Sequence, residues 1–437
     1  MTRQRKCALL VLDGLGDRAY ARFGYKTPLA AAKTPNLDSL AAKGANGLFH
    51  AYRPGIPLPS ENAHFAMFGF PREEFPGRGP LEAIGAGIDL KEGDVAVLSH
   101  FCCVENRQGR LYMERDRPEQ PNEAELDALF KAAAPFAFEG LTLRMAPVKK
   151  LFGVIIISGG ADPSFTDSNP MVDGRAISAV VPHASAPPAA ERTARALTAY
   201  LSRIHKTLHA HPVNVARRKN GLSPINAAVT QRPGKLKRIP PFHERFGMRG
   251  LTISSGVIYH GLCAYVGMDV MKAGESGDPG RDMAERLRMA REAFAEYDFI
   301  HIHTKAPDEA AHAKDPDLKK QVIESLDEGI GREIGALASD PDMILAVTAD
   351  HSTPSAGPLI HSGEPVPLCL CGPGVRRDQV TAFDEISAAA GSLGSLRGRE
   401  LFFNLLNAMD RAKLEGIRDT PQERQYWPGD YQPFTVV

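Results

Sequence analysis

The chain has 437 residues, of which 43% are hydrophobic and 24% are charged, and its 52 lysines and arginines balance its 52 aspartates and glutamates. This composition excludes disordered and fibrous chains, and the balanced charge argues against a broad nucleic-acid-binding surface. No apolar run approaches the roughly 20 residues that cross a membrane. We therefore expect a globular protein of two or three domains with neither a nucleic-acid partner nor a membrane partner.

The N-terminus and the cysteines indicate where the protein resides. The first apolar run, residues 7–12, ends at Asp13 and is too short for a signal peptide, whose apolar segment has about 7–15 residues. The cysteines lie mostly in apolar strand-like runs, with no CxxC motif: Cys7, Cys102, Cys103, Cys263, Cys369 and Cys371. Such residues are typical of buried thiols in a reducing compartment. We therefore expect a cytoplasmic protein.

Apolar runs of strand length alternate with helical stretches along the chain. The expected strands cover 7–12, 95–101, 152–158, 227–231, 250–255, 299–304, 343–349 and 365–372. The expected helices include 33–44, 123–133, 189–207, 281–296 and 318–338. Unbroken apolar runs are typical of buried parallel strands, so the alternation predicts an α/β fold with a doubly wound, mostly parallel sheet.

The segment 104–185 differs from this pattern. It begins with a polar stretch and continues with one helix and two strands. We expect it to form a small inserted α+β lid domain that binds substrate, between the core segments 1–103 and 186–437.

Acidic residues and histidines stand at the strand ends where an open parallel sheet gathers its ligands. They are Asp13 after 7–12, Asp308 and His312 after 299–304, Asp350 and His351 after 343–349, and His361 before 365–372. Each residue alone would be an ordinary turn or cap residue. It is improbable that chance alone would place Asp or His at four strand boundaries, so we predict a metal site.

The spacing of these residues supports that prediction. Asp308 and His312 are four residues apart, which places them on one face of a helix start. Asp350 and His351 can face one ion because residues 352–354, Ser-Thr-Pro, turn the chain. Oxygen and nitrogen donors without sulfur suit Mn²⁺, Mg²⁺ or Zn²⁺. The donors are too many for one four-coordinate zinc ion, so we expect two divalent ions, which would stabilise transfer at phosphorus.

Ser60 is the candidate nucleophile for such a transfer. It follows Pro59 and precedes an apolar helical run, so we expect it at a helix start, where free N–H groups and the helix dipole favour an alkoxide or a phosphate. In isolation it would be an ordinary N-cap serine. His64 lies four residues further, on the same helical face, and either binds substrate or packs.

These motifs, in this order, resemble the archaeal-type cofactor-independent (2,3-bisphosphoglycerate-independent) phosphoglycerate mutases of the alkaline phosphatase superfamily. The matching stretches are LDGLGDR (12–18), 26–44, 77–96, 211–221, VGMDV (266–270), KAPDEAAH (305–312), TADHSTP (348–354), 361–376 and 391–400. The resemblance implies an isomerase in which Ser60 takes the phosphate of 3-phosphoglycerate as a phosphoserine. The phosphate then returns to the 2-hydroxyl, while the inserted region helps to hold the glycerate.

The resemblance also implies a ligand set for each of two ions. One ion would take Asp13, Ser60, Asp350 and His351. The other would take Asp308, His312 and His361. The family usually uses manganese or magnesium and sometimes tolerates zinc, so Mn²⁺ is the expected ion.

Three departures from the family concern the substrate. The nucleophile segment reads Pro-Ser-Glu-Asn-Ala-His over 59–64 in place of Gly-Ser-Asp-Thr-Ala-His. His260 stands where the family has a lysine, and residues 114–118 replace an arginine-rich segment. The expected substrate-binding residues are His64, Arg115, Arg117, Asp167, Asn169, Arg232, Lys235 and His260.

Three functions are compatible with these residues. The first is a phosphoglycerate mutase of glycolysis and gluconeogenesis. The second, which His260 and the reduced arginine set favour, is a two-metal phosphatase, phosphonate hydrolase or mutase acting on another small phosphoacid. The third is a catalytically silent metal-binding protein, which the complete ligand set disfavours. Both a monomer and a homo-oligomer are compatible with the sequence.

Overall fold

The computed structural model describes residues 5–421, 423–426 and 432–436. The chain forms two compact units, one of Met1–Phe75 and Pro240–Val437 and the other of Pro76–Ile239. All six cysteines are buried and free, as expected. Within the described part of the chain, no helix combines the length and the apolar composition needed to span a membrane.

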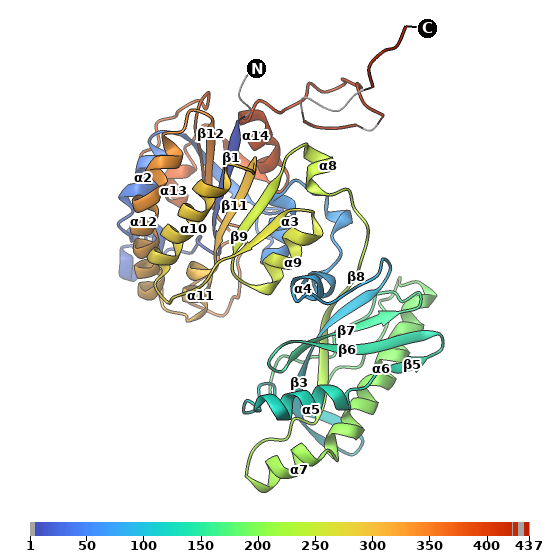
Figure 1. Cartoon of the computed structure of the whole chain (residues 1–437). Coiled ribbons are helices and arrows are strands. Elements are labelled where there is room, and N and C mark those ends of the chain that lie inside the picture. The colour runs from blue at the N-terminus through green and yellow to red at the C-terminus, as the bar shows by residue number, and fades with distance from the viewer. Residues whose placement is uncertain (1–4, 422, 427–431, 437) are drawn as a thin grey trace. The chain divides into compact units, whose positions relative to one another are not determined.

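The first unit contains an eight-stranded sheet (Figure 1). In spatial order its strands are β10 (Asp269–Lys272), β9 (Gly250–Ser254), β11 (Phe299–Thr304), β1 (Lys6–Leu12), β12 (Met343–Thr348), β13 (Val366–Cys371), β2 (Ala45–His50) and β14 (Gly394–Arg397). Neighbours from β10 to β12 are parallel, whereas β13 runs antiparallel to both β12 and β2. The mostly parallel sheet confirms the predicted fold class.

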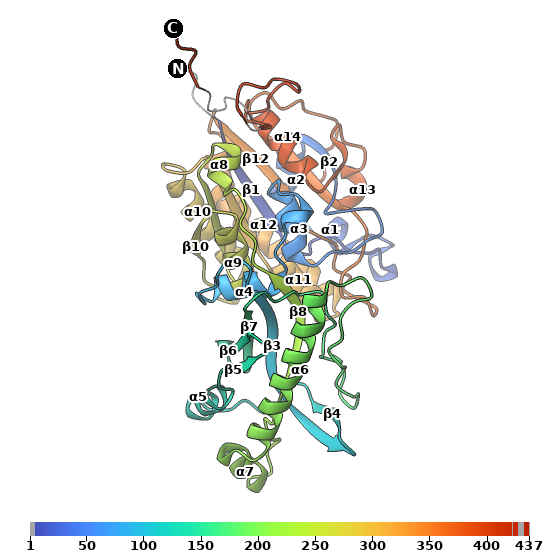
Figure 2. The ribbon, with the colours of Figure 1, turned by 90° about the vertical axis from the view of Figure 1, so that its right-hand side faces the viewer.

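Helices cover both faces of this sheet. They are α1 (Pro28–Ala31), α2 (Pro35–Ala41), α3 (Ser60–Met67), α8 (Phe242–Phe246), α9 (Val257–Tyr265), α10 (Pro279–Ala293), α11 (Ala306–His312), α12 (Pro316–Ala338), α13 (Glu385–Ala388) and α14 (Glu400–Ala408), with 3₁₀ turns at Ala21–Phe23 and Arg72–Glu74. Figure 1 shows α10 and α12 on one side of the strands and α3 and α9 on the other, and Figure 2 shows α3 and α14 in front of the sheet.

Asp-Pro pairs begin the two long helices of this unit. Asp278 caps α10 by accepting a hydrogen bond from the Arg281 N–H, and Pro279 follows it. Asp315 caps α12 in the same way, before Pro316. The carboxylate satisfies an N–H that the helix leaves without a partner, and proline fits the first helical position because it has no N–H to satisfy.

The second unit contains a six-stranded antiparallel sheet. Its strands are β3 (Val95–Arg107), β4 (Arg110–Arg115), β5 (Phe136–Phe138), β6 (Leu141–Lys149), β7 (Phe152–Ser158) and β8 (Ala227–Lys235), with β3 paired to β4, β7 and β8. Its helices are α4 (Arg78–Gly85), α5 (Glu123–Ala132), α6 (Pro188–His209) and α7 (Pro212–Lys219). The polar stretch after residue 103 therefore forms a β-hairpin, which the sequence analysis did not predict.

Three predicted core strands, 95–101, 152–158 and 227–231, belong to this antiparallel sheet and not to the parallel one. Helices pack on both of its faces, since α4 contacts β3, β7 and β8 while α6 contacts β6 and β8. Val95 and Val97 accordingly join one apolar cluster while Ala96 joins another. A strand buried on both faces shows an unbroken apolar run whatever its direction.

The boundaries of the second unit differ from the predicted insertion for the same reason. The expected domain covered 104–185, whereas the compact unit covers 76–239. It includes β3 and β8 because they pair with each other, and α6 because that helix packs on their sheet. The predicted return to the core at Pro187–Pro188 instead begins α6, a helix of the second unit.

Candidate active site

Loops at one edge of the parallel sheet carry the predicted ligands. β1, β11 and β12 end side by side, since Val11 is in register with both His303 and Thr348. Asp13 follows β1, α11 follows β11, and Asp350 and His351 follow β12. His361 reaches the same edge because β13, which it precedes, is antiparallel and begins where its neighbour ends.

Two groups of side chains gather there. Asp13, Asp350 and His351, here called the first ligand set, offer ligand atoms that all lie within 4.8 Å of one another. Asp308, His312 and His361, the second ligand set, meet the same limit. These are the groupings that the resemblance implies, and in the first ligand set Asp13 lies more than 300 residues from Asp350 and His351.

The first ligand set is completely buried and incompletely hydrogen-bonded. Asp13 Oδ1 and Asp350 Oδ2 are buried carboxylate oxygens without a hydrogen-bond partner. His351 Nε2 lies 3.6 Å from the Asp13 oxygen and 3.2 Å from the Asp350 oxygen. Buried carboxylates of like charge require a cation or a proton. The residues present therefore fit a divalent cation, which these two oxygens and the nitrogen would hold.

The pKa shifts of the two carboxyl groups show the same conflict. Burial and the nearby charge of Asp13 raise the pKa of Asp350 to about 7. Burial also acts to raise the pKa of Asp13, but Lys305 and the hydrogen bond from His303 outweigh it and hold that pKa below its usual range. Asp13 therefore keeps its negative charge, and this charge favours the protonated form of Asp350.

Ser60 begins α3 beside the first ligand set, as predicted. Its hydroxyl oxygen lies 3.0 Å from His351 Nε2, and the residue is 7% exposed. Pro59 precedes the helix and makes no side-chain cap, so Ser60 occupies the first helical position and not the N-cap. The serine hydroxyl thus faces the ligand set and does not cap the helix.

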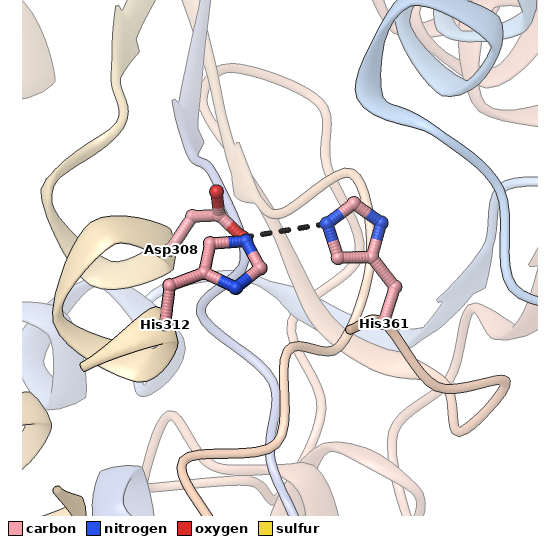
Figure 3. Close-up of side chains that lie close together, drawn as sticks. All are labelled: Asp308, His312 and His361. Atoms are coloured by element: carbon pink, nitrogen blue, oxygen red, sulfur yellow. Dashed lines mark ion pairs between the residues drawn. The ribbon is translucent and has the colours of Figure 1, made fainter. Parts of the chain in front are cut away.

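The second ligand set is centred on one carboxylate oxygen. Asp308 Oδ1 lies 3.3 Å from His312 Nε2 and 3.6 Å from His361 Nε2 (Figure 3). His312 and Asp308 come from α11, whereas His361 comes from the loop before β13. His361 Nδ1 contacts the Leu58 carbonyl at 3.0 Å, so it carries the proton there and leaves Nε2 free to bind a metal. His312 is 38% exposed, so this set is open to solvent.

The structure adds residues that the sequence analysis missed. The Lys305 ammonium lies 2.8 Å from Asp308 Oδ2 and 4.0 Å from Asp13 Oδ2, so it faces both ligand sets. His303 Nε2 lies 3.0 Å from Asp13 Oδ2, and the Tyr259 hydroxyl donates to the same oxygen. His301 and His303 alternate with apolar residues in the buried strand FIHIHT. Histidines in such a strand are unusual, and this pattern could have identified them as candidate site residues.

Two of the predicted substrate residues in this unit face other groups. His64 is fully buried among the rings of Phe68, Tyr259, His301 and His303, and its Nδ1 lies 2.8 Å from the Ser60 carbonyl. This favours the alternative that His64 packs. His260 Nε2 contacts the Ser254 carbonyl at 2.9 Å, and a substrate role for it stays a prediction.

The other predicted substrate residues belong to the second unit. Arg232 lies in β8 with a left-handed φ of 51°, and its N–H donates to Asp167 Oδ1 at 2.7 Å. Asn169 is bound by its N–H to the Thr230 carbonyl at 3.1 Å, so Asp167, Asn169 and Arg232 lie together. A non-glycine residue in this conformation is strained, and such strain clusters at binding sites.

The remaining three of these residues have partners within the second unit. Lys235 Nζ donates to the Ala161 carbonyl at 3.1 Å. Arg117 pairs with Asp116 at 2.9 Å and stacks over Phe152, while Arg115 pairs with Glu119. The second unit thus holds these cations in defined positions.

The fold and the two ligand sets define a metal-binding α/β protein, and the Metalloenzyme superfamily matches residues 5–408, so the chain belongs to that superfamily. The chain is 38% identical to 2,3-bisphosphoglycerate-independent phosphoglycerate mutase 2 of Methanocaldococcus jannaschii, over 97% of this chain and 98% of that protein. It is 35% identical to the enzyme named 2,3-bisphosphoglycerate-independent phosphoglycerate mutase in Methanopyrus kandleri, over 94% and 98%. The chain is therefore a member of the 2,3-bisphosphoglycerate-independent phosphoglycerate mutase family.

Solved structures agree with this assignment. The cofactor-independent phosphoglycerate mutase of Thermoplasma acidophilum is 29% identical, with a TM-score of 0.67 over 93% of this chain and 100% of that one. A Pyrococcus horikoshii protein, also 29% identical, matches with a TM-score of 0.77 over 95% and 100%.

Proposed function

We propose that this chain interconverts 3-phosphoglycerate and 2-phosphoglycerate in the cytoplasm, through a phosphoserine formed on Ser60. The observation that carries the proposal is the Ser60 hydroxyl, which lies at a helix start 3.0 Å from His351 in the buried first ligand set. The named activity of the relatives supports the substrate class, a small phosphorylated carboxylic acid.

The residues around Ser60 fit a pair of divalent ions. The first ligand set together with Ser60 would hold one ion, and the second ligand set would hold the other, with Mn²⁺ as the expected metal. When bound, such ions polarise phosphoryl oxygens and make a serine hydroxyl more acidic.

Ser60 performs the covalent step. Its Oγ forms a bond to phosphorus as the bond between phosphorus and the 3-oxygen of glycerate breaks, and the hydroxyl proton passes to that oxygen. The glycerate 2-hydroxyl then attacks the phosphoserine, which restores the Ser60 hydroxyl and yields 2-phosphoglycerate. The start of α3 favours the negative charge of the transferred group.

Lys305 supplies a cation for this charge. The Lys305 side chain is 33% exposed while the side chains of Asp13 and Asp308 are completely buried, so Lys305 lies between the two ligand sets and solvent. Cations on the carboxylates would free the ammonium to bind a phosphoryl oxygen. Lys305 could thus provide the charge that the family's lysine provides at the position of His260.

The second unit supplies candidate groups for the glycerate. Arg232, with its strained backbone, is the strongest of these because Asp167 and Asn169 hold its surroundings in place. Lys235, Arg115 and Arg117 are the remaining cations of the set. Their roles can be tested singly: Arg232→Ala should raise KM for phosphoglycerate more than it lowers kcat.

The relatives favour the mutase over the two alternatives, since each is named a phosphoglycerate mutase. One assay separates all three: purified protein with Mn²⁺ and 3-phosphoglycerate, without 2,3-bisphosphoglycerate, followed by phosphorus NMR. The mutase predicts 2-phosphoglycerate. Free phosphate alone would indicate a phosphatase, and an unchanged spectrum would indicate a silent protein.

Ser60→Ala tests the phosphoserine step. This variant should abolish turnover but keep its bound metal and its fold, because it removes a hydroxyl and little packing. Ser99→Ala is the matched control, since the Ser99 hydroxyl is buried without a hydrogen-bond partner and lies in the second unit. Turnover by Ser60→Ala close to that of the control would refute the phosphoserine.

A further inference from the structure

The hydroxyl group of Thr353 contacts a member of each ligand set. Its hydroxyl oxygen lies 2.8 Å from Asp308 Oδ1 and 3.1 Å from His351 Nδ1. The side chain is fully buried, so no solvent competes for either contact. The hydroxyl therefore joins the two ligand sets directly.

The chain around Thr353 fixes this hydroxyl in place. The Thr353 N–H donates to the Gly16 carbonyl at 2.9 Å, and the Thr353 carbonyl accepts from the buried Lys319 ammonium at 2.8 Å. Gly14 passes so close that a β-carbon there would lie 2.7 Å from the Thr353 hydroxyl and from Asp308. Only glycine leaves room for the side chain at this point.

The direction of the two hydrogen bonds follows from the groups involved. A hydroxyl has one hydrogen to donate, and an ionised carboxylate can only accept. Thr353 therefore donates to Asp308 and accepts from His351, which requires the hydrogen of the neutral His351 ring to lie on Nδ1. His351 Nε2 then presents its lone pair to Ser60 Oγ and Asp13 Oδ1, 3.0 Å and 3.6 Å away.

We propose that Thr353 is a positioning residue that holds His351 in the tautomer with hydrogen on Nδ1, and so ties the geometry of the first ligand set to that of the second. The inference rests on the proposed function, since it concerns how these residues bind two divalent ions. His361 reaches the same tautomer through a backbone carbonyl, that of Leu58. His351 depends instead on a side chain, that of Thr353, which also bonds to Asp308 of the second ligand set.

The tautomer can be measured in the metal-free protein, by nitrogen NMR of the protein labelled with ¹⁵N-histidine. His351, assigned by the signal lost in His351→Gln, should show hydrogen on Nδ1 and a free Nε2. Thr353→Val, which keeps the shape but loses the hydroxyl, should move His351 toward the opposite tautomer, and Thr353→Ser should restore it. His361 should not change. A parent protein with hydrogen on His351 Nε2 would overturn the proposal, as would a Thr353→Val protein with an unchanged His351.

The consequence for the ions can be measured by calorimetric titration with Mn²⁺ in two backgrounds. In His312→Ala, which breaks the second ligand set, Thr353→Val should lower the affinity for the remaining ion by roughly 10–100-fold, the usual effect of losing a group that orients a ligand. In the His351→Ala background, Thr353→Val should lower the Mn²⁺ affinity much less. Equal losses in both backgrounds would show that Thr353 acts only through packing and would overturn the proposal.

Thr348→Val is the control for losing a buried threonine hydroxyl. The Thr348 hydroxyl is also fully buried and donates to the Pro367 carbonyl at 2.9 Å, away from both ligand sets. It should leave the His351 tautomer and the Mn²⁺ affinity unchanged. If the parent protein binds no Mn²⁺, the proposed function fails, whereas the NMR measurement still decides the role of Thr353.

Discussion

The two ligand sets lie side by side at one sheet edge but differ in how far the protein satisfies them. In the first ligand set, Asp13 and Asp350 each bury an oxygen that has no hydrogen-bond partner. In the second, Asp308 Oδ2 also lacks a hydrogen bond, but it lies 2.8 Å from the Lys305 ammonium, while Thr353 and His361 lie near Oδ1. The first ligand set therefore lowers the folding stability of the metal-free protein. In the second ligand set, the charge of Asp308 is already balanced by that of Lys305.

Exposure separates the two sets in the same direction. All three members of the first ligand set are buried, whereas His312 of the second is 38% exposed. An ion in the second set should exchange with solvent more easily than an ion in the first. We therefore expect the first ligand set to hold an ion more firmly than the second.

The largest expected effect comes from a buried residue that supports both sets. The Lys319 ammonium is fully buried, donates to the carbonyls of Gly16 and Thr353, and lies 3.1 Å from Asp17. Lys319→Met should lower the free energy of unfolding by about 3–5 kcal/mol, because it leaves the Asp17 charge buried without its partner. It should also weaken the binding of an ion to either ligand set, which removes the contrast between the sets.

Lys320→Met is the control for that prediction. Lys320 is the next residue and pairs with Glu324 at 2.8 Å, but both side chains are partly exposed. Such a pair contributes at most about 1 kcal/mol. Urea unfolding of the two variants measures the contrast, and a Lys319→Met protein as stable as the Lys320→Met protein would refute the supporting role.

The next effect tests the contrast directly, with one carboxylate removed from each set in metal-free protein. At a pH above 7, where Asp350 is charged, Asp350→Asn should raise the free energy of unfolding by about 1–3 kcal/mol, because it removes a buried charge beside that of Asp13. Asp308→Asn should lower the free energy of unfolding by a similar amount, because Lys305 and Thr353 then lose their carboxylate partner. Urea unfolding after chelation measures both. Changes of the same sign in the two variants would contradict the comparison.

The next prediction concerns how the stability of the metal-free protein changes with pH, an effect that is smaller for each pH unit. Burial and Asp13 raise the pKa of Asp350 from 3.8 to about 7. A raised acid pKa means that the folded state binds the proton more tightly, so the contribution of Asp350 to stability is greatest below about pH 4 and falls as pH rises toward 7. The loss can reach about 1.4 kcal/mol for each pH unit. Unfolding measured across this range should show a flatter profile in Asp350→Asn than in the parent.

The sequence was sufficient to predict that the candidate metal ligands gather at one sheet edge, because of the geometry of parallel sheets. Strands that run the same way end at one edge, so Asp13, Asp308 and Asp350 had to lie near one another. The contacts that tune them were beyond the sequence. Tyr259 and His303 reach Asp13 from 246 and 290 residues away, and only the folded chain shows that they share one oxygen.

The domain boundaries were less predictable for a different physical reason. Periodicity reports burial and not strand direction, so the apolar run from Val95 could belong to either sheet. The run is unbroken because α4 and α6 cover both faces of the antiparallel sheet. Only the pairing of β3 with β7 and β8 assigns it to the second unit.

The smallest expected effect on stability is that of His312→Ala. His312 is the last residue of α11, is 38% exposed and contacts Asp308 at 3.3 Å, so its side chain contributes little burial. The free energy of unfolding of the metal-free protein should therefore change by less than about 0.5 kcal/mol. The number of Mn²⁺ ions bound after dialysis should nevertheless fall from two to one, because the second ligand set loses a nitrogen donor.

The matched variant of the first ligand set is His351→Ala, which should lose the other ion. Because His351 is buried and its ring stacks on His361 with centroids 3.7 Å apart, this variant should also lower the free energy of unfolding, unlike His312→Ala. Metal analysis after dialysis, paired with urea unfolding of chelated protein, separates the two effects. If His312→Ala destabilised the metal-free protein as much as His351→Ala, the exposed and buried sets would be energetically alike and the contrast between them would be wrong.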